Sequence, residues 1–252
     1  MRPLTLKATV LGGLLASVAV VSAQATPVTF SGIDANGSAF TPLSSTPNAD
    51  AARNDFFSNL NGVGTETFET LSGSAPLTVN FGAAGTATLN GSGSVVSVTP
   101  GTTNGAGRYS VPSASSSRYW EVTAGGAGTF SLAFSSPIAA FGFYGIDIGD
   151  FNGTVTLELT DTSSNVTSLT VPTAASNVAD GSVLYFGFYD LTTQYTSITF
   201  ATTGGTGDVF AFDNFSIGSA QQVIPNPVPE PMSLAVIGTG LLGLRLVRRR
   251  RG

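Results

Sequence analysis

The chain has 252 residues, of which 10% are charged, and it contains no histidine and no cysteine. These absences exclude a Ser/His/Asp triad, a Cys/His dyad, a thiolate nucleophile and an ordinary zinc site. The formal net charge is −5, but between residues 26 and 227 there are fourteen acidic residues against three basic ones, a net charge of −11. A surface of that sign repels phosphate backbones, which argues against nucleic-acid binding.

The first 25 residues are typical of a secretory signal peptide. Arg2 and Lys7 form a basic start, residues 8–21 are apolar, and Ala23 and Ala25 make an A-x-A site of small side chains. The short apolar helix suits the translocon and the small residues suit signal peptidase, so we expect cleavage after Ala25. The alternative is an N-terminal membrane helix that is retained.

Residues 26–64 are expected to form an N-terminal segment with one short amphipathic helix. In the stretch 46–62, TPNADAARNDFFSNLNG, Asn48 can cap the helix and Asp50 lies in the first turn. Apolar residues recur there at every fourth position, namely Ala52, Phe56 and Leu60. The spacing predicts a helix that packs against the domain that follows.

Residues 65–218 are rich in Thr, Ser, Gly, Val and Phe and alternate between apolar and polar side chains in short runs. We expect residues 65–71 to form the first strand of this domain. Ten further runs predict strands, namely residues 77–81, 94–99, 118–123, 129–134, 139–145, 153–160, 166–171, 183–189, 195–200 and 209–217. The pattern predicts an all-β, jelly-roll-like antiparallel sandwich as a single domain.

Aromatic residues divide between core and candidate binding positions. Six phenylalanines alternate within their runs and are predicted to be core, namely residues 141, 143, 186, 188, 210 and 212. Tyr119 and Trp120, beside Arg118, could stack on sugar rings. Because neighbouring strand residues face opposite sides, one of the two rings at most can point to solvent, and the tryptophan fits a core position as well.

Two pairs of carboxylates are candidate ligands for a structural calcium ion. Asp147 and Asp150 lie close together in GIDIGDFNGT, although the spacing does not match an EF-hand and the stretch can also be a simple turn. Glu69 and Asp213 are the preferred pair, because first and last strands commonly pair in jelly rolls. The switch of apolar phase after Phe212 also predicts a β-bulge at Asp213, and such a bulge needs no ion.

Enzyme activity is not expected. A glycosidase needs two carboxyl groups across a cleft, and the sequence does not bring any two of its glutamates together. The glycine-rich stretch 82–94 has no lysine with which to bind phosphate, and we interpret it as turns.

The C-terminus carries a second apolar segment after a linker at residues 219–227. Residues 232–247 are apolar except for Arg245, and sixteen residues make a helix of about 24 Å against a hydrocarbon core of about 30 Å. The four arginines that follow, Arg248, Arg249, Arg250 and Arg251, favour a cytoplasmic end for this helix. We expect a transient anchor in the inner membrane.

The order of these C-terminal features resembles a known sorting signal. Residues 228–252 place the VPEP sequence (Val228, Pro229, Glu230, Pro231) before the apolar helix and the arginine cluster, which is similar to the PEP-CTERM signal of Gram-negative bacteria. The resemblance implies that an exosortase removes the helix and the basic tail and delivers the rest to the cell surface or the extracellular polymer. The ectodomain also resembles a type that recurs among PEP-CTERM proteins and has no assigned activity.

These features together predict an exported protein of the cell surface or of an exopolysaccharide matrix such as a biofilm, with a structural or adhesive role. Its partners during export would be signal peptidase and the exosortase. The alternative function is a carbohydrate-binding module that contacts extracellular polysaccharide and is stabilised by calcium. A polysaccharide-active enzyme is a third and weaker hypothesis.

Overall fold

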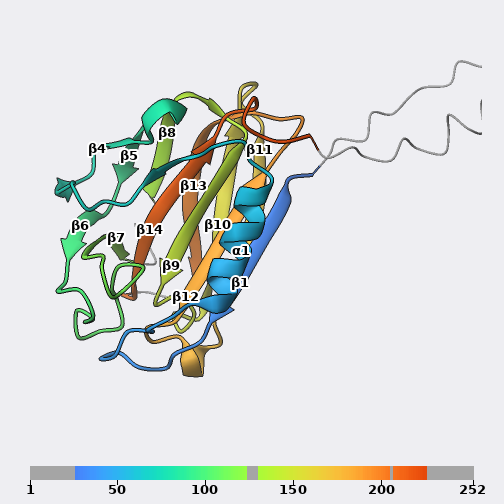
Figure 1. Cartoon of the computed structure of the whole chain (residues 1–252). Coiled ribbons are helices and arrows are strands. Elements are labelled where there is room, and N and C mark those ends of the chain that lie inside the picture. The colour runs from blue at the N-terminus through green and yellow to red at the C-terminus, as the bar shows by residue number, and fades with distance from the viewer. Residues whose placement is uncertain (1–25, 124–129, 205–206, 226–252) are drawn as a thin grey trace, which may run out of the picture.

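Two antiparallel β-sheets packed face to face make up the domain (Figure 1). The computed structural model describes residues 26–123, 130–204 and 207–225. The predicted signal peptide, the VPEP sequence, the C-terminal apolar segment and the arginine cluster lie outside these residues. Within them, no helix is both long and apolar enough to cross a membrane.

The larger sheet, which we call the helix-bearing sheet, has eight strands in the order β1-β12-β9-β14-β7-β6-β3, with β2 also paired to β14. Its strands are β1 (Val28–Asp34), β2 (Gly64–Glu66), β3 (Gly73–Ser74), β6 (Ser94–Ser97), β7 (Arg118–Thr123), β9 (Ala140–Ile146), β12 (Val183–Tyr189) and β14 (Val209–Gly218). All of its pairings are antiparallel.

The smaller sheet has six strands in the order β11-β10-β13-β8-β5-β4. They are β4 (Leu77–Asn80), β5 (Thr86–Gly91), β8 (Phe130–Ile138), β10 (Gly153–Asp161), β11 (Val166–Val171) and β13 (Tyr195–Gly204). From β7 to β14 the chain passes repeatedly between the two sheets, which is consistent with the predicted jelly-roll-like fold. Two 3-10 turns complete the elements, η1 (Gly82–Ala84) and η2 (Ser176–Val178).

The structure confirms the all-β sandwich and places a strand in each of the ten predicted runs, but it corrects three expectations. The first strand is β1, so the sandwich begins well before residue 65. The run 65–71 is broken, because β2 ends at Glu66 and Phe68 has a φ of 61°. The glycine-rich stretch 82–94 is not all turn, since β5 crosses it between β4 and β8.

The core between the sheets is built largely from aromatic rings. All six alternating phenylalanines are buried there as predicted. Phe143 shows the packing, with its ring centroid 5.1 Å from that of Phe200 and 5.6 Å from that of Phe212. Edge-to-face and tilted rings at such distances fill the interior densely and favour one arrangement.

A second core lies on the outer face of the helix-bearing sheet. The helix α1 (Pro47–Ser58) packs there against β1, β12 and β9 (Figure 1). Phe56 is fully buried and Ala52 nearly so, which confirms the predicted amphipathic helix. A side chain on the sheet glycine Gly32 would collide with the Asn48 carbonyl of the helix, one on Gly142 would collide with the Tyr185 hydroxyl, and one on Gly187 would crowd the Phe56 ring. The helix can therefore approach the sheet closely.

The residue that caps α1 is not the one expected from the sequence. Thr46 and Asn48 make no side-chain cap; instead the amides of Asn48 and Ala49 donate to Asp34 at the end of β1, at 3.1 Å and 2.9 Å. A carboxylate at a helix N-terminus satisfies orphan amides and complements the helix dipole. Asp34 thus joins the first strand to the helix, a long-range cap that no local pattern encodes.

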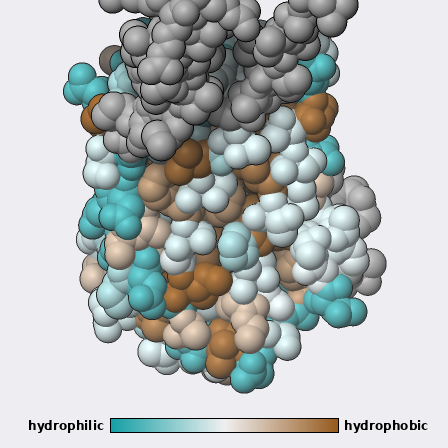
Figure 2. Space-filling model, turned by 90° about the vertical axis from the view of Figure 1, so that its right-hand side faces the viewer, coloured by the Kyte–Doolittle hydropathy of each residue, from teal (hydrophilic) through white to brown (hydrophobic). Residues whose placement is uncertain are grey.

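Exposed large hydrophobic residues are scattered over different segments. They are Val28, Phe40, Val166, Leu191 and Ile224. On the face that Figure 2 shows, hydrophobic residues form separate patches among polar ones. Single exposed apolar residues of this kind are normal on a folded surface.

Candidate functional site

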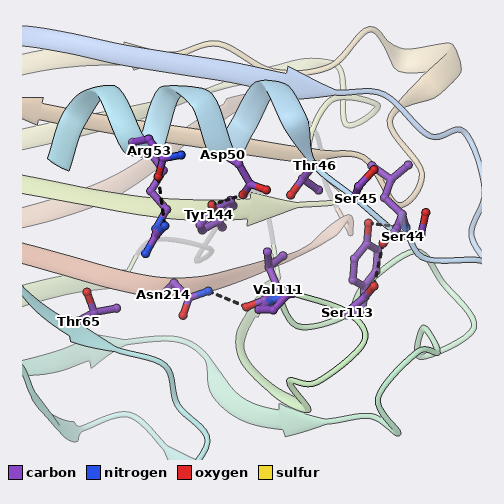
Figure 3. Close-up of a pocket in the computed structure, with 14 residues that line it drawn as sticks. Ser44, Ser45, Thr46, Asp50, Arg53, Thr65, Val111, Ser113, Tyr144 and Asn214 are labelled. Atoms are coloured by element: carbon purple, nitrogen blue, oxygen red, sulfur yellow. Dashed lines mark hydrogen bonds between the residues drawn. The ribbon is translucent and has the colours of Figure 1, made fainter. Parts of the chain in front are cut away.

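A pocket opens beside α1 on the outer side of the helix-bearing sheet, and we call it the α1 pocket (Figure 3). Its volume is about 550 Å³. Its walls come from the middle of α1, from residues 43–46, from residues 109–113, and from side chains on β2, β9 and β14. The pocket is thus formed where segments far apart in the sequence meet over the second core.

Helix α1 supplies the charged wall of the α1 pocket. Asp50 and Arg53 are three positions apart, so they lie on the same side of the helix. The Tyr144 hydroxyl, from β9, donates to Asp50 Oδ1 at 2.6 Å. Arg53 lies over the Phe57 ring, with the guanidinium carbon 4.5 Å from the ring centroid. Asp50 is therefore positioned by a hydrogen bond from the sheet, and Arg53 by a cation–π contact within its own helix.

The environment of Tyr144 keeps its hydroxyl protonated. Burial raises the pKa of Tyr144 well above its usual value, and the nearby Asp50 carboxylate raises it further. The hydroxyl is consequently a hydrogen donor at all physiological pH values. This donor orients the Asp50 carboxylate toward the pocket.

Tyr109 ties together the two loop segments that form walls of the pocket. Its hydroxyl donates to the Gly181 carbonyl at 2.8 Å and accepts from the Leu43 amide at 3.1 Å. Ser113 Oγ donates to the Leu43 carbonyl at 2.7 Å, so residues 43–46 and 109–113 are linked at two points. Burial raises the pKa of Tyr109 to about 12, which also keeps this hydroxyl protonated.

The β-bulge in β14 supplies the opposite wall. The register against β9 shifts between Asp213 and Ser216, and Asn214 has a φ of 52°, so the predicted bulge is confirmed. The bulge turns Asn214 toward the pocket, where its Nδ2 donates to the Val111 carbonyl at 2.6 Å (Figure 3). Asp213 points instead beneath the loop.

Asp213 is fully buried and holds residues 110 and 111 in place. Its Oδ2 accepts from Ser110 Oγ at 2.6 Å and from the Val111 amide at 2.9 Å. Complete burial raises the pKa of Asp213 to about 8, although these donors lower it. The negative charge of Glu69 adds to the increase. The carboxyl group positions a wall of the pocket without facing it.

Glu69 fixes the far end of the same loop. Its Oε1 accepts from the amides of Ser117 and Arg118 at 2.8 Å and 2.9 Å, and Ser110 Oγ lies 3.4 Å from the same oxygen. Burial raises the pKa of Glu69, but the hydrogen bonds from Arg118, Ser117 and Ser110 outweigh burial and lower it overall. Glu69 and Asp213 thus act as two clamps on residues 110–118.

The structure brings the preferred calcium pair, Glu69 and Asp213, together through Ser110. Both carboxylates accept hydrogen bonds from protein donors. Across residues 26–123, 130–204 and 207–225 no group of three or more acidic, histidine or cysteine side chains could hold a metal. Calcium at this pair remains a prediction.

The second predicted pair, Asp147 and Asp150, has two different environments. Asp147 is buried and accepts from the Gly181 amide at 3.1 Å and from Arg108 Nη1 at 3.2 Å. Burial raises the pKa of Asp147 to about 6 despite these partners. Asp150 is exposed and lines a separate shallow hollow. Calcium at this pair also remains a prediction.

The aromatic residues proposed for sugar stacking are both buried. Trp120 belongs to the core between the sheets, as its alternative interpretation predicted, and Tyr119 belongs to the second core. Neither ring has any exposed surface. Neither ring faces solvent, because Tyr119 is buried in the same cluster as Tyr109 and Val111 of the loop before β7.

Glu66, Glu121 and Glu158, which a glycosidase would have to bring together in pairs, lie in separate environments. Glu66 accepts from the amides of Phe68 and Asn80, and Glu121 pairs with Arg108 at 2.9 Å. Glu158 is exposed on β10 of the other sheet. The α1 pocket is lined by none of them.

The residues that line the α1 pocket were missed at the sequence level. The i, i+3 spacing of Asp50 and Arg53 was visible, but nothing in it indicated that Tyr144 and Asn214 would lie opposite. The signal peptidase and sorting residues lie outside the described ranges.

No protein-family model matches the chain, and no curated protein matches it. Among solved structures it is similar to a mutant of CBM29-2, a family 29 carbohydrate-binding module, at 17% identity and a TM-score of 0.33 over 66% of this chain and 99% of that one. It is also similar to the C-terminal family 22 carbohydrate-binding module of Clostridium thermocellum Xyn10B, at 17% identity and a TM-score of 0.35 over 66% and 98%. Scores of this size leave the function to be argued from the chain's own residues.

Proposed function

We propose that the protein is an exported protein of the cell surface or extracellular matrix that binds carbohydrate in its α1 pocket. One observation carries the proposal: the pocket places an acceptor-only carboxylate, Asp50, beside a donor-only guanidinium, Arg53, with the amide of Asn214 across from them. Sugar hydroxyls both donate and accept hydrogen bonds, so a wall that offers both roles matches them.

The surroundings of the pocket suit the same ligand class. Its volume of about 550 Å³ lies within the range of small-molecule sites, about 300–1,000 Å³. Ser44, Ser45 and Thr65 add hydroxyl groups to the rim. Because Tyr109 and Asp213 hold the loop segments that form the walls, the pocket is largely formed before a ligand binds, which reduces the entropy cost of binding.

Export and surface delivery form the other half of the proposal. The signal-peptide pattern at residues 1–25 and the resemblance of residues 228–252 to a PEP-CTERM signal support them. Signal peptidase would cut after Ala25, and an exosortase would cut near Pro229 to Pro231 after a transient stay in the inner membrane. Intact-mass measurement of the secreted form tests this step. A mature protein that still carries Arg248 to Arg251 would contradict it.

The proposed role is non-enzymatic, structural or adhesive. The α1 pocket presents one carboxylate, whereas glycoside hydrolysis commonly requires two acids across the scissile bond. A carbohydrate-binding module needs no such pair. Release of reducing sugar from any glycan that binds would contradict the non-enzymatic role.

A glycan array with three forms of the protein tests carbohydrate binding at the α1 pocket. We expect the wild type to bind a set of glycans and Asp50→Ala to lose at least about tenfold in affinity, since one charge-assisted hydrogen bond is removed. Asp55→Ala is the matched control, because Asp55 is an exposed acid on the same helix that does not line the pocket. Equal loss in both variants, or no glycan bound by the wild type, would contradict the proposal.

A further inference from the structure

The electrostatic balance of the α1 pocket differs from that of the domain around it. Of the described residues that line the pocket, Asp50 and Arg53 are the charged ones, so the lining is close to neutral. The chain between residues 26 and 227 has a net charge of −11. A ligand therefore approaches through a negative field and then meets one charge of each sign.

Asp50 keeps one carboxylate oxygen available to a ligand. Tyr144 donates to Oδ1, and among the described residues no hydrogen bond to Oδ2 is formed. A carboxylate oxygen accepts hydrogen bonds and cannot donate them, so a sugar hydroxyl satisfies it and a second carboxylate repels it.

The positive charge of Arg53 is already partly balanced, so Arg53 can donate to a sugar hydroxyl but attracts an added anion only weakly. Its guanidinium stacks over Phe57, its Nη1 is 3.4 Å from Asn54 Oδ1, and Asp50 offsets its charge from one helical turn away. The other two arginines in the described residues are engaged elsewhere. Arg108 pairs with Glu121 and Asp147, and Arg118 donates to the Leu71 carbonyl. No further cation lines the pocket within the described part of the chain.

We propose that the α1 pocket selects neutral sugar units over uronate units, and that Asp50 is the residue that excludes the anion. This inference rests on the proposed carbohydrate binding and names its ligand class. A neutral sugar can place neighbouring hydroxyls on Asp50 and Arg53, whose Cβ atoms are about 5–6 Å apart at this spacing. A uronate brings its carboxylate beside Asp50 and loses affinity by like-charge repulsion.

The test uses pairs of oligosaccharides that differ in the oxidation state of C6. Suitable probes are cellohexaose against the β-1,4-linked glucuronate hexamer, and β-1,4-mannohexaose against the mannuronate hexamer. Titration calorimetry with the full chain at low salt, about 50 mM, keeps the electrostatic contribution large. We expect the neutral member of a pair to bind at least about tenfold more tightly than its uronate partner.

Two variants separate the local effect of Asp50 from the net charge of the domain. Asp50→Asn should reduce the preference for the neutral sugar to within about threefold, because the repulsion is removed. Asp55→Asn changes the net charge by the same amount outside the pocket and should leave the preference unchanged. In the wild type the preference should weaken at about 0.5 M salt, where charges are screened within a few ångströms.

Three results would overturn the inference. Tighter binding of the uronate, lost in Arg53→Gln, would show that Arg53 pairs with an anionic sugar. A preference that persists at high salt would indicate exclusion by shape. Equal effects of Asp50→Asn and Asp55→Asn would assign the preference to net charge. Each of these leaves carbohydrate binding itself intact, whereas failure of both members of every pair to bind would contradict the proposed function as well.

Discussion

The two cores of this molecule differ in composition and in what they build. The core between the sheets is apolar and largely aromatic, and its members come from alternating positions of the strands. The second core, between α1 with its neighbouring loops and the outer face of the helix-bearing sheet, is smaller and contains Tyr109, Tyr119, Tyr144, Tyr185 and Tyr189. Buried acids, Asp34 and Asp213, lie beside it.

The first core therefore determines the fold, whereas the second core determines the geometry of the site. Phenylalanine rings need no partners beyond other carbon atoms, so the first core can be packed from hydrophobic pattern alone. In the second core the hydroxyls of Tyr109 and Tyr144 and the carboxyl group of Asp213 have hydrogen-bond partners in other segments, and these contacts hold particular loops in position. The α1 pocket lies over the second core for that reason. Substitutions in the two cores should therefore have different consequences.

The largest effect is expected in the first core. Phe143→Ala removes a ring that packs against five other phenylalanine rings and should lower the free energy of unfolding by about 3–5 kcal/mol. Denaturant titration measures the change. Phe40→Ala is the control, because Phe40 is 78% exposed and should cost less than about 0.5 kcal/mol. Comparable losses in both variants would contradict the assignment of the core.

A smaller loss of stability is expected where side chains beside the second core hold the wall of the pocket by hydrogen bonds. Ser110→Ala removes the hydroxyl that donates to buried Asp213, and an under-satisfied buried acid should cost about 1–3 kcal/mol. Because residues 110–113 form a wall of the pocket, Ser110→Ala should also weaken glycan binding by the folded protein. Phe143→Ala should weaken glycan binding only by lowering the fraction of folded protein. Glycan titration under conditions where both variants are folded distinguishes the two. Full binding by Ser110→Ala would argue against the clamp.

Asp213 should also make stability depend on pH. Its pKa is about 8 in the folded protein against an ordinary 3.8, so the folded state binds more protons and stability falls as pH rises through that window. The titration of Asp147 also lowers stability as the pH rises to about 6, so the decrease between pH 6 and 8 is due to Asp213. The slope there should approach at most about 1.4 kcal/mol per pH unit. Unfolding free energies from pH 5 to 9 should show it in the wild type, and Asp213→Asn should remove it. A flat wild-type profile would contradict the burial argument.

The smallest effect on stability is expected at the pocket itself. Asp50→Asn and Arg53→Gln change half-buried polar groups and should alter the free energy of unfolding by less than about 0.5–1 kcal/mol. Thermal and denaturant unfolding measure this directly. A loss as large as that of Phe143→Ala would mean that these residues serve packing and not recognition.

The same division explains what could be predicted from the sequence. Period-two alternation located ten strands and the phenylalanine core, because those residues are determined by which face of a strand is buried. The bulge at Asp213 was predicted from the change of apolar phase in β14. Its neighbour Glu69 was predicted as a partner because first and last strands commonly pair; β2 does pair with β14, although β1 precedes it.

The α1 pocket could not be predicted, because its geometry depends on contacts between distant segments. Asp34 caps a helix that begins thirteen residues later, Tyr144 on β9 orients Asp50, and Asn214 lies opposite only because the bulge turns it. Strand β1 was missed since its alternation is short and it lies in a segment assigned to the helix. Tyr119 was misjudged because nothing in its own strand shows that a loop covers it.

Carbohydrate binding at the α1 pocket is best tested by titrating the wild type and Arg53→Gln, as full chains, with the glycans selected on an array. We expect that the wild type binds and that Arg53→Gln loses at least about tenfold in affinity, because a donor fork is lost, while its unfolding free energy is nearly unchanged. Equal affinity of the two proteins for every bound glycan, or no binding by the wild type to any glycan, would contradict the claim that the α1 pocket binds carbohydrate.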